Sequence, residues 1–452
     1  MKRDDEDQTS RSGNWTVVSV AAALLMCVVA LPVAHSQTYT VLHNFTDGGD
    51  GAIPMAGLTM DAAGNFYGTT QYGGNTHCNL GCGTVFKLTH QGSSWVLTTL
   101  YQFTGGAEGS GPIARVVFGP DGALYGTANG GAYPGACCGS VFRLTPPATF
   151  CRSAICPWNI TILHQFSGGY DGGSPGYGDL IFDAAGNIYG TTEMGGPASL
   201  ICPGGCGVVF ELVKASGWAL SGLYRFTGQA DGATPAGGVV FDASGDLLGT
   251  TLYGGYIDLP DGFLGAGVIF KLTHNGSGWT ESVPYMFQDS SGDGGLPYAS
   301  LTVGPSGTIY GTTASGGGGN CNFELYSGCG TVFESFGRTD FGFFPNVNLA
   351  ESYISGPFAP VTFDPAGHMN GTTWGDGENG PGNVFQLTYF EGNWVYSSLY
   401  DFSGGSDGGF PASNVITDSH GNYYGTASAG GSQNTCTIPN RPGCGVIWEI
   451  TP

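Results

Sequence analysis

The chain has 452 residues, and its 83 glycines and 25 prolines are too many for a helical protein. Its 13% aromatic and 41% hydrophobic content is too high for a disordered one. A formal net charge of −22 leaves no basic patch to neutralise phosphates, so we expect no nucleic-acid partner.

Residues 1–36 are predicted to be an export signal. Lys2 and Arg3 precede an apolar run from Val17 to Ala34, and Ala34-His35-Ser36 places small residues where a signal peptidase needs them. A retained membrane anchor is the alternative, although polar and proline residues interrupt the run. We expect cleavage, no membrane attachment of the mature chain, and one monomeric domain over residues 37–452 that is secreted, extracellular or periplasmic.

A Tyr-Gly-Thr core, first found at Tyr67-Gly68-Thr69, organises the rest of the chain. Its central glycine recurs at intervals of 58, 64, 59, 62, 60 and 54 residues, at Gly68, Gly126, Gly190, Gly249, Gly311, Gly371 and Gly425. A period of this length, carried by short alternating strands and glycine turns, is typical of stacked or radially arranged β-units. Seven copies favour a single closed array over independent domains.

Each copy is predicted to be a blade of four antiparallel strands, A to D. In the first copy, period-two alternation and glycine turns delimit them as Gly57 to Asp61, Asn65 to Thr70, Thr84 to Thr89 and Trp95 to Phe103. The seven repeat cores lie near residues 57–103, 115–166, 179–226, 238–287, 300–354, 360–402 and 414–451. Strand D of the fifth blade is expected between Phe341 and Ile354.

The two ends of the chain are complementary. Residues 38–45 match strand D without any preceding A, B or C, and the chain ends after Val446 to Ile450, a strand C with no D behind it. We therefore predict an all-β fold, a seven-bladed β-propeller of four-stranded antiparallel blades, in which the N-terminal strand completes the last blade.

Loop lengths give each blade a polarity. The distance from the end of strand A to the central glycine is seven residues in every copy, whereas the distance from that glycine to the aromatic residue of strand C is 18, 16, 20, 21, 22, 14 and 23 residues. The variable B-to-C loops share one face with the D-to-A loops, so binding is expected there.

The D-to-A loops carry an Asp-Gly-x-x-Pro motif, as at Asp50 to Pro54. A turn is predicted, in which Asp bonds the backbone ahead, Gly takes a positive φ and Pro ends the strand. Calcium is the alternative, but one Asp in each loop offers too few ligands.

Twelve cysteines follow the leader, and an even number in an exported chain predicts disulfides. Four pairs each staple one B-to-C loop, namely Cys78 with Cys82, Cys202 with Cys206, Cys321 with Cys329, and Cys436 with Cys444. Cys151 and Cys156 would staple an insertion, while the neighbours Cys137 and Cys138 join each other or pair elsewhere. Zinc is the competing interpretation, and the spacings do not match a zinc module.

The repeated Gly-x-x-Tyr-Gly-Thr-Thr, Gly-Gly and Gly-x-Val-Phe-x-Leu motifs resemble those of the bacterial choice-of-anchor tandem-repeat GloVer-containing protein family. The resemblance spans roughly Tyr39 to Thr451, and several matching copies make it more specific than one short motif. It implies an exported or surface protein and brings no established activity. Because Thr451 and Pro452 directly follow the last predicted strand, we expect free secretion or periplasmic residence rather than covalent anchoring.

No catalytic motif, metal site or cofactor site is predicted, because the eight histidines form no metal or triad pattern and no nucleophile elbow or phosphate loop occurs. The variable face is instead rich in aromatic residues, which could stack on a sugar ring or an extended peptide. The candidate ligand-binding residues are Tyr72, Tyr133, Tyr253, Tyr256, Phe323, Tyr326 and Trp374. The alternative is that these rings pack over the disulfides.

The sequence favours a binding module for a glycan, cell-envelope or protein ligand. The alternative is a polysaccharide hydrolase or lyase that uses carboxylates such as Glu193, Glu324 and Asp376. A surface protein without a specific ligand is the third hypothesis.

Overall fold

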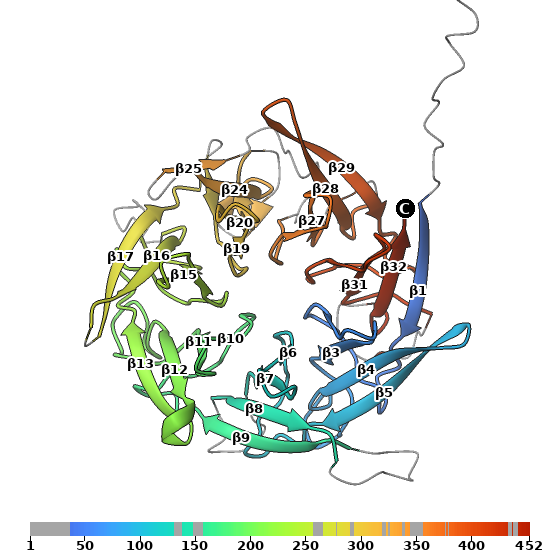
Figure 1. Cartoon of the computed structure of the whole chain (residues 1–452), viewed down its shortest axis with the longest axis horizontal. Coiled ribbons are helices and arrows are strands. Elements are labelled where there is room, and N and C mark those ends of the chain that lie inside the picture. The colour runs from blue at the N-terminus through green and yellow to red at the C-terminus, as the bar shows by residue number, and fades with distance from the viewer. Residues whose placement is uncertain are drawn as a thin grey trace, which may run out of the picture. The chain divides into compact units, whose positions relative to one another are not determined.

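Seven four-stranded antiparallel sheets surround a common axis, which confirms the predicted propeller (Figure 1). They belong to one compact unit, Thr38–Thr451. The computed structural model describes residues 37–130, 138–147, 157–255, 265–276, 278–289, 293–318, 322–323, 326–336, 340–343, 356–375, 377, 379–432, 436 and 442–452, with backbone only at 322–323, 326–327, 336 and 340–343. The predicted leader lies outside these residues. None of them forms a helix long and apolar enough to cross a membrane.

In every blade the strands follow the order A, B, C, D from the axis outward (Figure 1). Blades one to four comprise β2 (Thr59–Met60), β3 (Phe66–Thr70), β4 (Thr84–Gln91) and β5 (Ser94–Gln102); β6 (Val117–Phe118), β7 (Leu124–Ala128), β8 (Ser140–Thr145) and β9 (Asn159–Gln165); β10 (Ile181–Phe182), β11 (Ile188–Thr192), β12 (Val208–Val213) and β13 (Ala219–Arg225); and β14 (Val240–Phe241), β15 (Leu247–Thr251), β16 (Val268–His274) and β17 (Trp279–Met286). A short 3-10 turn, η2 (Lys214–Ser216), joins β12 to β13.

Blades five to seven comprise β19 (Thr302–Val303), β20 (Ile309–Thr313), β24 (Thr331–Phe336) and β25 (Asp340–Phe343); β26 (Thr362–Phe363), β27 (Met369–Thr373), β28 (Asn383–Phe390) and β29 (Asn393–Asp401); and β30 (Ile416–Thr417), β31 (Tyr423–Ala427), β32 (Val446–Thr451) and β1 (Thr38–Asn44). Two small two-stranded sheets accompany blade five, formed by β18 (Gly294–Gly295) with β21 (Ser315–Gly316) and by β22 (Asn322–Phe323) with β23 (Tyr326–Ser327). Strand β25 overlaps the start of the stretch expected to hold strand D.

The predicted closure of the ring is confirmed. Strand β1 pairs antiparallel with β32, with Tyr39 opposite Ile450 and Val41 opposite Trp448. The Tyr39 ring also stacks on Tyr400 of blade six, with ring centroids 3.8 Å apart. The first ordered strand and the last one therefore belong to the same sheet, and blade seven has no open edge along β32.

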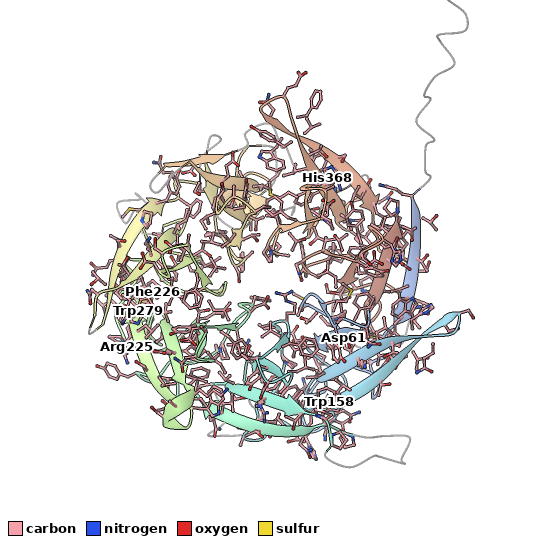
Figure 2. All side chains as sticks on the ribbon, viewed as in Figure 1. Asp61, Trp158, Arg225, Phe226, Trp279 and His368 are labelled. Carbon is pink, nitrogen blue, oxygen red and sulfur yellow. A yellow bond between two sulfur atoms is a disulfide. The ribbon has the colours of Figure 1, made fainter. Side chains whose placement is uncertain are left out.

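Glycine occupies the centre of Tyr-Gly-Thr because an aromatic ring of strand C lies against it. A Cβ atom added to Gly68 would lie 2.5 Å from Cζ of Phe86, and the same overlap with the strand C ring, at 2.3–2.7 Å, recurs in all seven blades. The phenylalanine that follows strand D then contacts the strand C ring of the next blade. Phe226, labelled in Figure 2, lies 5.0 Å from Phe270 between ring centroids.

In blade one, a single aspartate organises the A-to-B turn. Oδ1 of Asp61 accepts hydrogen bonds from the backbone N–H groups of Ala63 and Asn65 at 2.9 Å, and the Tyr67 hydroxyl donates to Oδ2 at 3.0 Å (Asp61 is labelled in Figure 2). An insertion would separate the carboxylate from the tyrosine of the core.

The D-to-A motif joins neighbouring blades. Its proline lies against the glycine that precedes strand C of the previous blade: a Cβ atom on Gly83 would come 2.6 Å from Cδ of Pro112, and the other six blade junctions repeat this contact at 2.4–2.9 Å. The predicted positive φ is confirmed, as in Gly51 at 99°. The predicted direction of the aspartate bond was wrong. Asp50 accepts from the backbone N–H of Thr46, four residues before it, at 3.1 Å, because the loop doubles back on itself.

Strand A is shorter than predicted, with two paired residues in β2 where five were expected. The backbone before it leaves the sheet and bonds to the neighbouring blade: the carbonyl of Ala56 accepts a hydrogen bond from Oγ1 of Thr426 at 2.9 Å. At Gly57 a Cβ atom would lie 1.5 Å from Oδ1 of Asn414, which shows how closely the blades converge at the axis.

Candidate functional site

One residue of each blade, immediately after strand B, marks the mouth of the ring on the face of the variable loops. We call these the rim residues: Gln71, Asn129, Glu193, Leu252, Ala314, Trp374 and Ser428. The backbone N–H of every rim residue donates to the carbonyl of the residue before the loop proline of its own blade or its structural equivalent, at 2.9–3.4 Å. The B-to-C and D-to-A loops are therefore joined on one face, as predicted.

In six blades the residue before the loop proline is held in a left-handed conformation. Ile53 and Thr234 both have φ of 56°, which is unusual for β-branched side chains. Each is fixed by a bond to the previous blade, from the N–H of Ile53 to the carbonyl of Cys444 at 2.9 Å and from that of Thr234 to Cys206 at 2.8 Å. This turn sends the residues beyond the proline toward the axis.

A pocket lies on the axis, because residues of six blades line it together, from Met55 of blade one to Asn414 of blade seven. Arg115 and Asp179 form an ion pair in its wall. The guanidinium donates from Nε and Nη2 to Oδ2 of Asp179 at 2.9 and 2.6 Å. The charge of Arg115 is thus matched inside the protein.

Five aromatic side chains form a continuous series around the mouth, which we call the aromatic arc. Ring centroids are 6.5 Å apart between Tyr177 and Tyr298, 4.7 Å between Tyr298 and Phe358, 5.5 Å between Phe358 and Trp374, and 5.6 Å between Trp374 and Phe410. Tyr177 keeps 38% of its surface exposed. The arc runs from blade three to blade seven and supplies an apolar surface beside the axis.

A polar cavity of about 420 Å³ lies on the side of blades one to three. Gln71, Asn79, Ser110, Asn129 and Ser174 line it together with the Tyr72 ring. Among the described residues, the buried Oδ1 of Asn129 has no hydrogen-bond partner. An amide oxygen buried without a partner is costly, so a ligand hydroxyl that reached it would be favoured.

Glu193 is the one ionisable rim residue, and it lies against the backbone of blade three. A Cβ atom on Gly176 would be 2.2 Å from Oε1 of Glu193, so the carboxyl group lies directly beside the residue that precedes Tyr177. Burial raises the pKa of Glu193 to about 7, because the charged form is poorly solvated there. The other two carboxylates of the hydrolase hypothesis, Glu324 and Asp376, lie outside the described residues.

The predicted ligand-binding residues have different environments. Tyr72 lines the polar cavity and Trp374 belongs to the aromatic arc, and both also pack partly buried against one core cluster. Tyr253 packs partly buried against the cores on both sides of blade four. Tyr133 and Tyr256 lie outside the described residues. Phe323 and Tyr326 pair in the β22–β23 hairpin, and their side chains are not described. A ligand role for all seven stays a prediction.

Sequence reasoning missed Tyr177, Tyr298, Phe358 and Phe410. All four lie within two residues of a loop proline, a position given only to turn formation. Comparing the residues that flank this proline across the seven copies would have shown aromatic side chains in blades three, five, six and seven.

Three predicted disulfides are present, Cys78–Cys82, Cys202–Cys206 and Cys436–Cys444, each within one B-to-C loop. Cys138 and Cys329 are also disulfide-bonded. Their candidate partners Cys137 and Cys321, and the predicted pair Cys151 and Cys156, lie outside the described residues. Within the described part of the chain, no three His, Cys, Asp or Glu side chains form a group that could hold a metal ion.

Several solved structures are similar to this chain at low identity. A putative oxidoreductase (glucose dehydrogenase) from Thermus thermophilus is 14% identical with a TM-score of 0.40, covering 92% of this chain and 100% of that one. NanB sialidase from Streptococcus pneumoniae is 9% identical with a TM-score of 0.42, covering 91% and 70%. Trypanosoma rangeli sialidase is 10% identical with a TM-score of 0.44, covering 81% and 59%. Likenesses this weak support no statement about activity.

The comparison with protein families, in contrast, identifies the family of this chain. No curated protein matches this chain. The model of the Gloeobacter/Verrucomicrobia repeat matches residues 28–199 and 154–326, two overlapping stretches that together cover more than half of the chain. With its recurring Tyr-Gly-Thr cores arranged as propeller blades, the chain belongs to the Gloeobacter/Verrucomicrobia repeat family, the GloVer family that its motifs resemble.

Proposed function

We propose that this protein is a secreted or periplasmic binding module that holds a carbohydrate at the mouth of the ring, on the face of the B-to-C loops. The observation that supports this most is the division of the rim. Blades one to three contribute the polar Gln71, Asn129 and Glu193, and blades four to six contribute the apolar Leu252, Ala314 and Trp374. A sugar ring has the same division, with an apolar C–H face and hydroxyl groups around its edge.

Each half of the mouth has the chemistry that its half of a sugar needs. The aromatic arc offers flat rings to the C–H face, and Trp374 lies in its middle, between Phe358 and Phe410. The polar cavity offers amide and hydroxyl groups, including the unpartnered oxygen of Asn129. Amides both donate and accept hydrogen bonds, so they match a hydroxyl group in either role.

The test is binding of the purified mature protein to a glycan array, followed by calorimetric titration of the best ligand. Trp374→Ala should weaken binding about tenfold, the order expected when a stacking contact is lost. Tyr389→Ala is the matched control, because Tyr389 is an exposed aromatic residue, 60% accessible, on β28 near the C-to-D turn at the opposite face. It should bind like the wild type.

Two results would contradict the proposal. One is the absence of binding to any glycan or cell-envelope fraction, and the other is equal affinity of the Trp374→Ala variant and the wild type. New reducing ends released from a bound polysaccharide would instead support the hydrolase hypothesis, and the same samples can be assayed for them.

A further inference from the structure

The carboxyl group of Glu193 has an unusual environment for an acidic side chain. It lies beside the backbone of Gly176, partly buried, and among the described residues burial alone sets its pKa, with no hydrogen bond or ion pair opposing that effect. Several of the aspartates of this protein are placed differently. Asp61 and Asp50, for example, each accept several hydrogen bonds. A carboxylate without such partners favours any cation that can reach it.

The positive charge that lines the axial pocket is already balanced by a carboxylate. Arg115 and Asp179 pair through two hydrogen bonds in the axial pocket, so the guanidinium neither neutralises Glu193 nor leaves a cationic mouth. The chain as a whole has 34 acidic and 12 basic residues. Its field therefore concentrates cations, not anions, at the surface.

The aromatic arc begins one residue from the backbone that Glu193 contacts. Tyr177 directly follows Gly176, and its ring leads through Tyr298 to Phe358. The faces of aromatic rings attract a cation within about 6 Å of their centres. A carboxylate beside a series of such rings is a recognised arrangement for holding an ammonium group.

We propose that the carbohydrate bound at this mouth carries a free, protonated amine, with the ammonium group pairing with Glu193 beside Tyr177 while the sugar ring lies on the aromatic arc. This inference rests on the proposed function and names its ligand class: amino sugars that are not acetylated. Acetylation would remove the charge and leave the Glu193 carboxyl without a counterion. Pairing would also return Glu193 to its ionised form, since a nearby cation lowers the pKa of a carboxyl group.

The experiment compares two ligands of equal length, a glucosamine oligomer and the corresponding N-acetylglucosamine oligomer, by calorimetric titration at neutral pH. The wild type should bind the amine form at least about tenfold more tightly, the order of one charge-assisted hydrogen bond. Glu193→Gln should remove that preference, because it takes away the charge that pairs with the ammonium group. Glu391→Gln, at an exposed turn on the opposite face, changes the net charge equally and should keep the preference.

The outcomes separate the two proposals. Equal affinity for both oligomers, or a preference that survives in Glu193→Gln, overturns the amine inference and leaves carbohydrate binding intact. Binding of neither these oligomers nor any other glycan overturns carbohydrate binding itself. The ligand comparison uses the unmodified protein, so it decides the question even if a variant fails to fold.

Discussion

Replacing Phe45 by alanine tests whether the ring is closed by its first strand. Phe45 directly follows β1, is 1% exposed, and its ring lies 5.4 Å from that of Phe86 in blade one. Phe103 holds the same place in blade one, is 0% exposed, and lies 5.2 Å from Phe142 in blade two. The two residues make the same contact at two blade junctions, and they differ only in whether the chain is continuous with the rest of their blade.

The expected cost is the same at both positions. Truncating a fully buried phenylalanine to alanine lowers the free energy of unfolding by about 3–5 kcal/mol, through lost burial and the cavity left behind. If β1 is an integral strand of blade seven, Phe45→Ala should therefore destabilise the protein as much as Phe103→Ala. If β1 were a loosely attached tail, the loss would be below about 1 kcal/mol, as for a surface substitution.

Urea unfolding without reductant, monitored by tryptophan fluorescence, measures the free energy of unfolding of both variants and of the wild type. Phe390→Ala serves as the control for aromatic truncation, since Phe390 is 62% exposed on β28 and should change the unfolding free energy by less than about 0.5 kcal/mol. A wild-type midpoint for Phe45→Ala, with a lowered one for Phe103→Ala, would refute the closure argument.

Three further predictions concern local features. Gly83→Ala should cost about 1–3 kcal/mol more than Gly92→Ala in thermal unfolding. Both glycines have positive φ, yet a Cβ atom on Gly83 would overlap the carbonyl oxygen of Thr70 at 2.4 Å and Cδ of Pro112 at 2.6 Å, while nothing lies within 4 Å at Gly92. Equal costs would show that close packing at this blade junction is unimportant. The pKa of Glu193 is raised to about 7 on folding from an unfolded value of about 4.3, so wild-type stability falls as pH rises between these values. Glu193→Gln should therefore gain in stability relative to the wild type across that interval, and a constant difference would contradict the assignment. The pKa of Asp61 is shifted in the opposite direction. Burial raises this pKa, but hydrogen bonds from Asn65, Tyr67 and Ala63 outweigh burial and lower it. Asp61→Asn should lose about 1 kcal/mol at neutral pH, and the loss should fade as the wild-type carboxylate is protonated below about pH 4; a loss that persists in acid would exclude the ionised carboxylate as its cause.

The fold was predictable because each feature that defines it recurs in register. The central glycine must make room for a strand C ring, as Gly68 does for Phe86, and this requirement repeats at every blade. The complementary ends of the chain then leave one way to complete blade seven, which β1 and β32 follow. Both inferences come from comparing equivalent positions of the repeats. Neither requires knowing which non-equivalent residues touch each other.

The mouth was less predictable because its residues belong to different blades. They come together only when the blades assemble into the ring. Tyr177 and Tyr298 belong to blades three and five, and no local pattern places their rings 6.5 Å apart. Tyr72 and Tyr253 hold equivalent positions in the sequence and both pack partly buried against core clusters, yet Tyr72 also lines a cavity. Position in a repeat therefore places a residue on the face of the variable loops without showing whether it lines a cavity.

The features on which the two proposals rest lie where the sevenfold pattern is broken. In six blades the threonine of the core donates from Oγ1 to a backbone carbonyl of the next blade, at 2.8–3.2 Å. Among the described residues, the buried Oγ1 of Thr127 in blade two has no such partner. The cause lies in blade three, where Leu180 follows Pro175 by five positions while the corresponding spacing in the other blades is four.

That additional residue removes one bond of the scaffold and creates the irregular part of the mouth. It lies in the stretch that holds Gly176, beside which the Glu193 carboxyl lies, and Tyr177, whose ring contacts Tyr298 of blade five. Asp179, which pairs with Arg115, belongs to the same stretch. A symmetric ring offers seven equivalent rim positions and no reason for a ligand to choose among them. A single inserted residue makes the sector of blade three differ from the others, and such asymmetry is what a specific binding site would require.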